Sequence, residues 1–161
     1  MTSTDRTTLG LAAGLGAVAG LRSMAAPALL SRRLARARGR GRNAAARLLG
    51  SPWAVRMLPA FALGELVADK LPVTPARTEP TSLAGRVGSG ALCGAAVAGW
   101  SGGPAVSAAL VGAAAALGSS FLAYHLRKAA GESTGVPDPL LGLTEDALAY
   151  TAGARLAGAV T

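Results

Sequence analysis

Cysteine, histidine, aromatic residues and charge are all scarce in this chain of 161 residues. It has one cysteine, one histidine, 4% aromatic residues and 15% charged residues. The lone Cys93 excludes a disulfide or a paired redox motif within the chain. His125 has no second histidine or cysteine for a metal, and no pattern ties it to a nucleophilic serine. We therefore expect no metal, no cofactor and no catalytic residue, and the sequence does not favour an enzyme.

Apolar sequence, by contrast, is abundant. Hydrophobic residues make up 51% of the chain, there are 22 glycines, and the mean hydropathy is +0.41. A soluble domain of this size usually carries more charge on its surface, and its apolar residues alternate with polar ones at a regular period. Here the apolar residues come in blocks, which indicates an integral membrane protein.

Five blocks approach the length of about 20 mainly apolar residues that a helix needs to cross a bilayer. They are residues 9–30, 53–73, 83–100, 105–126 and 139–160. Alanine and leucine favour helix, and the blocks do not show the alternation of membrane β-strands. The sequence predicts one all-α domain over residues 1–161, a polytopic membrane helix bundle of about five segments, with residues 9–30 as one continuous span.

The positive charge is concentrated in one place. The net charge is +8, and seven arginines fall within residues 31–47, namely Arg32, Arg33, Arg36, Arg38, Arg40, Arg42 and Arg47. This stretch has no aromatic residue on which a base could stack, so nucleic acid is not the expected partner. The positive-inside rule makes 31–47 a cytoplasmic loop that contacts anionic lipids. A single crossing by 9–30 then puts the N-terminus outside the cell membrane.

Two of the blocks share a short frame that suggests an internal repeat. Residues 59–65 and 139–145 both read P-x-x-x-L-x-E, and a Gly/Ala-rich block precedes each. An odd number of segments between the copies gives them opposite topology, and such inverted repeats are common in small transporters. A chance match between two Ala/Leu-rich helices explains the frame equally well.

A few charged residues interrupt the apolar blocks and are the candidate site. Glu65 and Asp69 lie four residues apart, on one face of a helix. A carboxylate in hydrocarbon costs a few kcal/mol, so such residues usually face the bundle interior and pair or bind something. We expect Arg22 to bridge Glu65 or Glu145 and to form a ligand or ion site with them. The alternatives are a purely structural ion pair and an Arg22 that extends to the headgroups.

Other polar residues receive weaker predictions. Asp146 is adjacent to Glu145, and its structural alternative is a position at a helix start, where a carboxylate favours the positive end of the dipole. Arg77 and Arg86 belong to the proline-rich connection Pro72–Arg86, where they could contact an anion or a lipid headgroup. An ordinary structural turn is the alternative reading of that connection.

Glycines recur at four-residue spacing, which allows helix backbones to approach closely. The pairs are Gly10 with Gly14, Gly16 with Gly20, and Gly90 with Gly94. Such pairs arise often by chance in this composition. We therefore expect close packing from them and do not assign a dimer signature.

Four stretches together resemble one family. They are Gly20-Leu21-Arg22, Glu65-Leu-Val-Ala-Asp69-Lys70-Leu-Pro72, Arg77-Thr-Glu-Pro80 with Gly85-Arg86, and Glu145-Asp146. With the Gly/Ala-rich helices between them, they look like the bacterial membrane proteins of domain of unknown function 4126. The resemblance implies a multi-pass integral membrane protein without an established activity, so it supports the medium and supplies no reaction.

Two hypotheses follow from the sequence. In the first, the protein transports or binds a small solute or ion at the cluster of Arg22, Glu65, Asp69 and Glu145. In the second, it is a membrane scaffold or lipid-binding protein whose buried charges are structural. The expected partners are the bilayer, anionic lipids, a small solute or ion, and a second copy of the chain.

Overall fold

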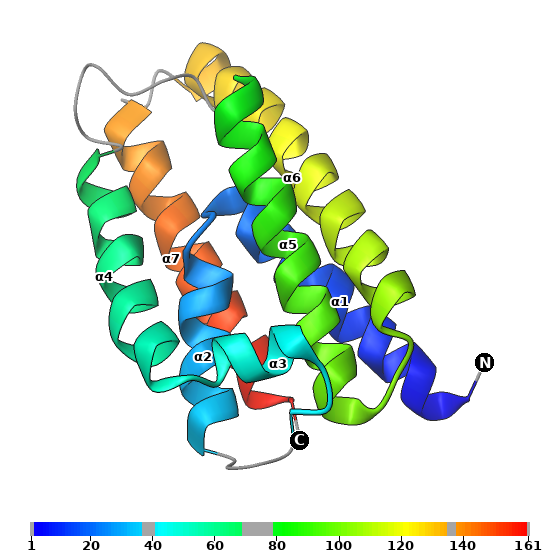
Figure 1. The fold of residues 1–161 in the computed structure, drawn as a ribbon. Coiled ribbons are helices and arrows are strands. Elements are labelled where there is room, and N and C mark those ends of the chain that lie inside the picture. Colours follow the sequence, from blue (N-terminus) through cyan, green and yellow to red (C-terminus); the bar gives the residue numbers. More distant parts are fainter. Residues whose placement is uncertain (1, 37–40, 69–78, 135–137, 161) are drawn as a thin grey trace.

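The computed structural model describes residues 2–36, 41–68, 79–134 and 138–160. In this part of the chain every regular element is an α-helix, which confirms the all-α prediction. The helices are α1 (Ser3–Leu21), α2 (Ala25–Arg36), α3 (Ala44–Leu49), α4 (Pro52–Ala68), α5 (Pro80–Ser101), α6 (Ala105–Thr134) and α7 (Asp138–Gly158). The last four correspond to the last four predicted blocks. They form a bundle around α1 and α2 (Figure 1).

The helix α6 has the strongest membrane character. Among the described residues it is the one helix long and apolar enough to cross a membrane, over Ala105–Ser133. By this criterion the structure supports one of the five predicted spans. The blocks 53–73, 83–100 and 139–160 are supported as helices only.

The first predicted span is not one helix, so that prediction was wrong. The helix α1 ends at Leu21, and Arg22 has an extended backbone with φ −140° and ψ 111°. The next helix, α2, begins at Ala25. Proline explains the position of the break, because the ring of Pro27 would clash with the carbonyl of Ser23 in a continuous helix. In the first turn of α2 the same proline is tolerated, since the N–H groups there have no partner within the helix.

The break also turns the chain back, so that α1 rises into the bundle and α2 returns toward the end from which α1 started (Figure 1). Thr8, near the start of α1, hydrogen-bonds at 2.7 Å to Ser101 at the end of α5. Near the other terminus, Arg33 of α2 donates to the carbonyl of Val160 at 2.9 Å. One end of the bundle therefore holds the start of α1, the helix α3 and the last described residues of the chain. The prediction that the N-terminus lies opposite the Arg-rich loop does not fit this arrangement.

Helices α1, α5 and α6 approach one another through glycines. A Cβ atom added to Gly16 would lie 2.2 Å from the carbonyl oxygen of Gly112, so only glycine fits at this crossing. The close pairs are Gly16 with Gly112, Gly20 with Ala116, Gly90 with Gly112, and Gly94 with Ala108. Both Gly16/Gly20 and Gly90/Gly94 thus make the close approach expected from their spacing. Gly10 does not, because no atom of another residue lies within 4 Å of its added Cβ.

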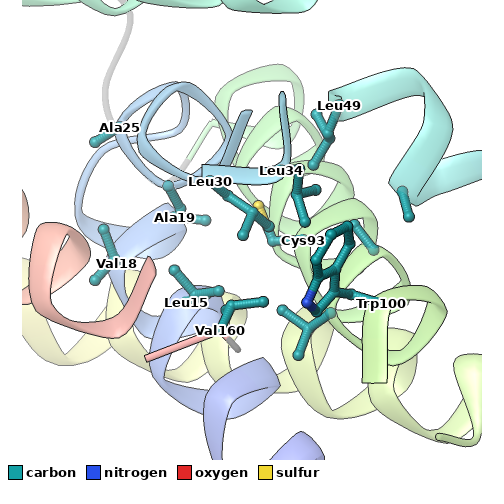
Figure 2. Close-up of a cluster of buried hydrophobic side chains, with 14 of the residues drawn as sticks. Leu15, Val18, Ala19, Ala25, Leu30, Leu34, Leu49, Cys93, Trp100 and Val160 are labelled. Carbon is teal, nitrogen blue, oxygen red and sulfur yellow. The ribbon is translucent and has the colours of Figure 1, made fainter. Parts of the chain in front are cut away.

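Larger apolar side chains fill the space between this three-helix contact and the helices α2 and α3. Leu15, Leu30, Leu49 and Trp100 meet in one buried cluster, with the fully buried Cys93 among them (Figure 2). Cys93 is therefore a packing residue. The cluster fixes α2 against α5 and so holds the break between α1 and α2 in place.

Candidate functional site: a broken helix in the bundle

The break between α1 and α2 exposes backbone groups that a continuous helix would satisfy. The last carbonyls of α1 and the first N–H groups of α2 have no partner within their own helix. Such groups need partners when they are buried, because an unpaired buried polar group is costly. Side chains from α4, α5 and α6 supply these partners.

The carbonyl end of α1 is capped by Arg86 of α5. Its Nη1 donates to the carbonyl oxygens of Gly20 at 2.6 Å and Leu21 at 2.8 Å, and the residue is only 3% exposed. From α6, the hydroxyl of Ser120 also donates to Gly20, at 3.0 Å. A buried cation here complements the negative end of the α1 dipole. Arg86 was expected to contact an anion or a lipid headgroup or to lie in a structural turn, whereas the structure places it inside the bundle.

The opposite end of the break is capped by Glu65 of α4. Its Oε1 accepts hydrogen bonds from the backbone N–H and the hydroxyl of Ser23, both at 2.9 Å. Its Oε2 accepts from the N–H of Met24 at 2.9 Å. A carboxylate at this position satisfies orphan donors of α2 and favours the positive end of its dipole. Glu65 thus does from a neighbouring helix what an N-cap residue does locally.

Arg22 lies at the break itself and pairs with Asp146 of α7. Its Nε and Nη2 both lie 2.5 Å from Oδ1 of Asp146. The two residues are 2% and 8% exposed. The expectation that Arg22 bridges Glu65 or Glu145 was wrong for this ion pair. Glu65 caps α2, and the guanidinium of Arg22 pairs with Asp146.

The side chain of Glu145 faces α6 and not the break. It forms an ion pair with Arg127 of α6, with 3.8 Å between Oε2 and Nη1. Adjacent residues on a helix differ by about 100° in direction, so Glu145 and Asp146 face different neighbours. The predicted pairing of Glu65 with Glu145 in one cluster is therefore not what the structure shows.

The inward face of α7, which carries Asp146, can be recognised from the sequence. Small residues recur every three or four positions along α7 and are buried together with Asp146, as is typical of the inward face of a helix. They are Gly142, Ala149, Gly153 and Ala157. The serines that bond to the break carried no comparable signal, because serine is frequent throughout the chain. Asp69 and Arg77, both predicted site residues, lie outside the described residues.

The helix directions differ from those of the predicted inverted repeat. The glycine contacts pair Gly16 with Gly112 and Gly20 with Ala116, so α1 and α6 run parallel. The helices α4 and α7, which carry the shared frame, run in opposite directions (Figure 1). Two inverted copies of a helix pair would require both helices to be reversed. These pairs therefore do not have the arrangement that was expected.

The resulting site is a cluster of four buried or half-buried charges, Arg22, Glu65, Arg86 and Asp146. Two are positive and two are negative, and they come from the break and from three other helices. Across the described part of the chain, no group of three or more His, Cys, Asp or Glu side chains could hold a metal ion. Both carboxylates of the cluster have fixed partners, since Glu65 accepts hydrogen bonds from Ser23 and Met24 and Asp146 pairs with Arg22.

A family model of domain of unknown function 4126 matches residues 9–158. The chain belongs to this family. The matched residues include the four charged residues of the cluster, Arg22, Glu65, Arg86 and Asp146. No curated protein and no solved structure matches the chain.

Proposed function

We propose that this member of family 4126 is a multi-pass membrane protein that moves a small solute or ion with the help of a proton site at Glu65. The observation that carries the proposal is the break between α1 and α2, with charged side chains converging on it. Irregular backbone at membrane depth is tolerated where it is buried in protein or lines a water-filled cavity. Broken helices of this kind form the binding sites of many transporters.

The membrane location is supported by the apolar surface of three helices. Large hydrophobic side chains are exposed along α4, α6 and α7, where a water-soluble domain would rarely leave so many together. They include Phe61, Leu63 and Val67 on α4, Val106, Leu110, Phe121, Leu122 and Leu126 on α6, and Leu140, Leu143 and Leu148 on α7. The 30 residues of α6 extend about 45 Å at 1.5 Å per residue, more than the roughly 30 Å of a hydrocarbon core.

The orientation follows from the arginines. Arg32, Arg36, Arg42, Arg47 and Arg56 are all exposed on α2, α3, α4 or the residue stretch beside α3. This end of the bundle also holds both ends of the described chain (Figure 1). The positive-inside rule favours this end in the cytoplasm, where its arginines would contact anionic lipids. Both termini would then be cytoplasmic.

Proton binding at Glu65 would change the contact between α4 and α2. The ionised carboxylate accepts three hydrogen bonds from Ser23 and Met24. Protonation removes its negative charge and converts one acceptor oxygen into a donor. The attraction to the positive end of α2 is then lost, so α4 and α2 can separate. A carboxylate that binds a proton in one of two arrangements and releases it in the other would carry protons across the membrane.

A membrane scaffold or lipid-binding protein is the second candidate, and a specific observation favours it. Arg22 is paired with Asp146, Glu65 with three donors, and Arg86 with two carbonyls. If these contacts are permanent, the charges only hold the broken helix together.

Proton flux into liposomes separates the two candidates. We expect wild-type protein, reconstituted with a trapped pH-sensitive dye and driven by a potassium diffusion potential, to acidify the lumen faster than empty liposomes. Glu65→Gln should reduce the flux to the level of empty liposomes, because an amide does not titrate. Glu132→Gln, which removes an exposed carboxylate from α6, is the matched control and should retain the flux.

Two results would contradict the transport proposal. One is a wild-type flux no greater than that of empty liposomes. The other is an unchanged flux in Glu65→Gln together with a lower thermal midpoint, which would assign Glu65 to the scaffold role.

A further inference from the structure

A groove separate from the charge cluster lies between α1, α6 and α7. Its volume is about 440 Å³. This is within the range of about 300 to 1,000 Å³ that is typical of ligand sites. Leucines form much of its walls, with Leu122 and Leu126 on α6 and Leu141 and Leu148 on α7, and Ala17 of α1 also lines it. An apolar chain is the chemistry that fits such a lining.

Two charged residues, Arg127 and Glu145, also line the groove. They form an ion pair with 3.8 Å between their charged groups, and the side chains are 25% and 11% exposed. A Cβ added to Gly142 would lie 3.3 Å from Nη2 of Arg127, so the guanidinium reaches across to the backbone of α7. The groove therefore presents a cation and an anion side by side.

The position of this charge pair along α6 fits the headgroup layer of a bilayer. About 20 helical residues cross the hydrocarbon core. Counted from Ala105, they end near His125, and Arg127 follows directly. The apolar lining residues Leu122 and Ala123 precede Arg127 and so lie deeper. A ligand with its head at Arg127 would thus extend its chain toward the interior of the membrane.

We propose that this groove binds a zwitterionic aminophospholipid, with one acyl chain in the groove, the phosphate on Arg127 and the primary ammonium on Glu145. A guanidinium donates in parallel to phosphate oxygens, and a carboxylate accepts from an ammonium N–H. A choline headgroup has no N–H to donate, and an anionic headgroup without an amine likewise offers no N–H to the Glu145 carboxylate. The inference rests on the membrane location proposed above and not on the proton site.

The test compares lipids that differ only in the headgroup. Purified protein in detergent is heated with phosphatidylethanolamine, phosphatidylcholine or phosphatidylglycerol of identical chains. We expect phosphatidylethanolamine to raise the unfolding midpoint by about 5 °C more than either other lipid, at a concentration about 100-fold above its Kd. Glycerophosphoethanolamine, which has the same headgroup without chains, should give no such rise.

Matched variants locate the site. Arg127→Gln and Glu145→Gln should each abolish the preference for phosphatidylethanolamine. Lys128→Gln and Glu132→Gln remove the same charges from exposed positions on α6 and should retain it. Ala123→Trp fills the groove and should prevent stabilisation by phosphatidylethanolamine, whereas Ala114→Trp, at an exposed position of α6 outside the groove, should allow it.

Three outcomes would overturn the proposal. They are equal stabilisation by phosphatidylethanolamine and phosphatidylcholine, greater stabilisation by phosphatidylglycerol, and a preference that survives in both Arg127→Gln and Glu145→Gln. A loss of lipid preference would leave proton flux through the Glu65 site unaffected, so the two proposals fail independently.

Discussion

Replacing Arg22 by methionine is expected to lower the free energy of unfolding by about 3–5 kcal/mol. The substitution removes the cation from a buried ion pair and leaves Asp146, which is 8% exposed, without its guanidinium. An uncompensated charge in the interior is costly, and the attraction that it loses is strong where water is excluded. The change is measured by thermal or chemical unfolding of the purified protein in detergent.

Two further variants identify the cause of this loss. The double variant Arg22→Met with Asp146→Leu removes both charges and should recover much of the stability, because well-packed apolar residues can replace a buried ion pair. Arg47→Met removes an exposed arginine and should change stability by no more than about 0.5 kcal/mol. A loss in Arg22→Met no larger than that in Arg47→Met would show that the pair does not hold the break together.

Replacing Gly112 by alanine is the second change with a large expected effect. An added Cβ would lie 2.2 Å from the carbonyl oxygen of Gly90, a backbone atom that can move only if α5 and α6 separate. Gly112 also faces Gly16 of α1, so one methyl group disturbs two helix contacts. We expect a loss of about 1–3 kcal/mol or more from overpacking. Unfolding in detergent measures it.

Gly118 on the same helix provides the control. Nothing lies within 4 Å of a Cβ added there, so Gly118→Ala keeps the packing unchanged. It should stabilise α6 by up to about 1 kcal/mol, because alanine is the better helix former. If both alanine variants behaved alike, the close approach of α1, α5 and α6 would not be a determinant of stability.

Much of the fold can be predicted from the sequence, because composition and small-residue spacing are local signals. The Ala/Leu-rich blocks predict the helices α4 to α7, and the spacing of Gly16 and Gly20 predicts a close helix crossing. The turn of the chain after Leu21 was not predicted. It depends on Pro27 and on partners that are distant in sequence, such as Glu65 and Arg86, which together make a break more stable than a continuous helix.

The candidate site, like the fold, can be predicted from the sequence only in part. Arg22 and Glu65 can be recognised from sequence as charges that neither water nor the positive-inside rule explains. Their contacts cannot be predicted from sequence, because the directions of the helices determine which carboxylate pairs with which arginine. The buried stripe of small residues on α7 singles out Asp146, but its pairing with Arg22 follows only once α7 is known to pack beside the break. Glu145 resembles Glu65 in sequence and lies in the groove instead.

We propose that α1 enters and α2 leaves the bundle at the same cytoplasmic end, and labelling of single cysteines from outside intact cells tests this proposal most directly. The native Cys93 is fully buried and should not react. Cysteines at the exposed positions Ser3, Arg47 and Gly158 should react with a membrane-impermeant maleimide only after the membrane is permeabilised. A cysteine at Ser133, near the far end of α6, should react in intact cells. Labelling of the Ser3 and Arg47 positions from opposite faces, or of all four positions from one face, would contradict the account.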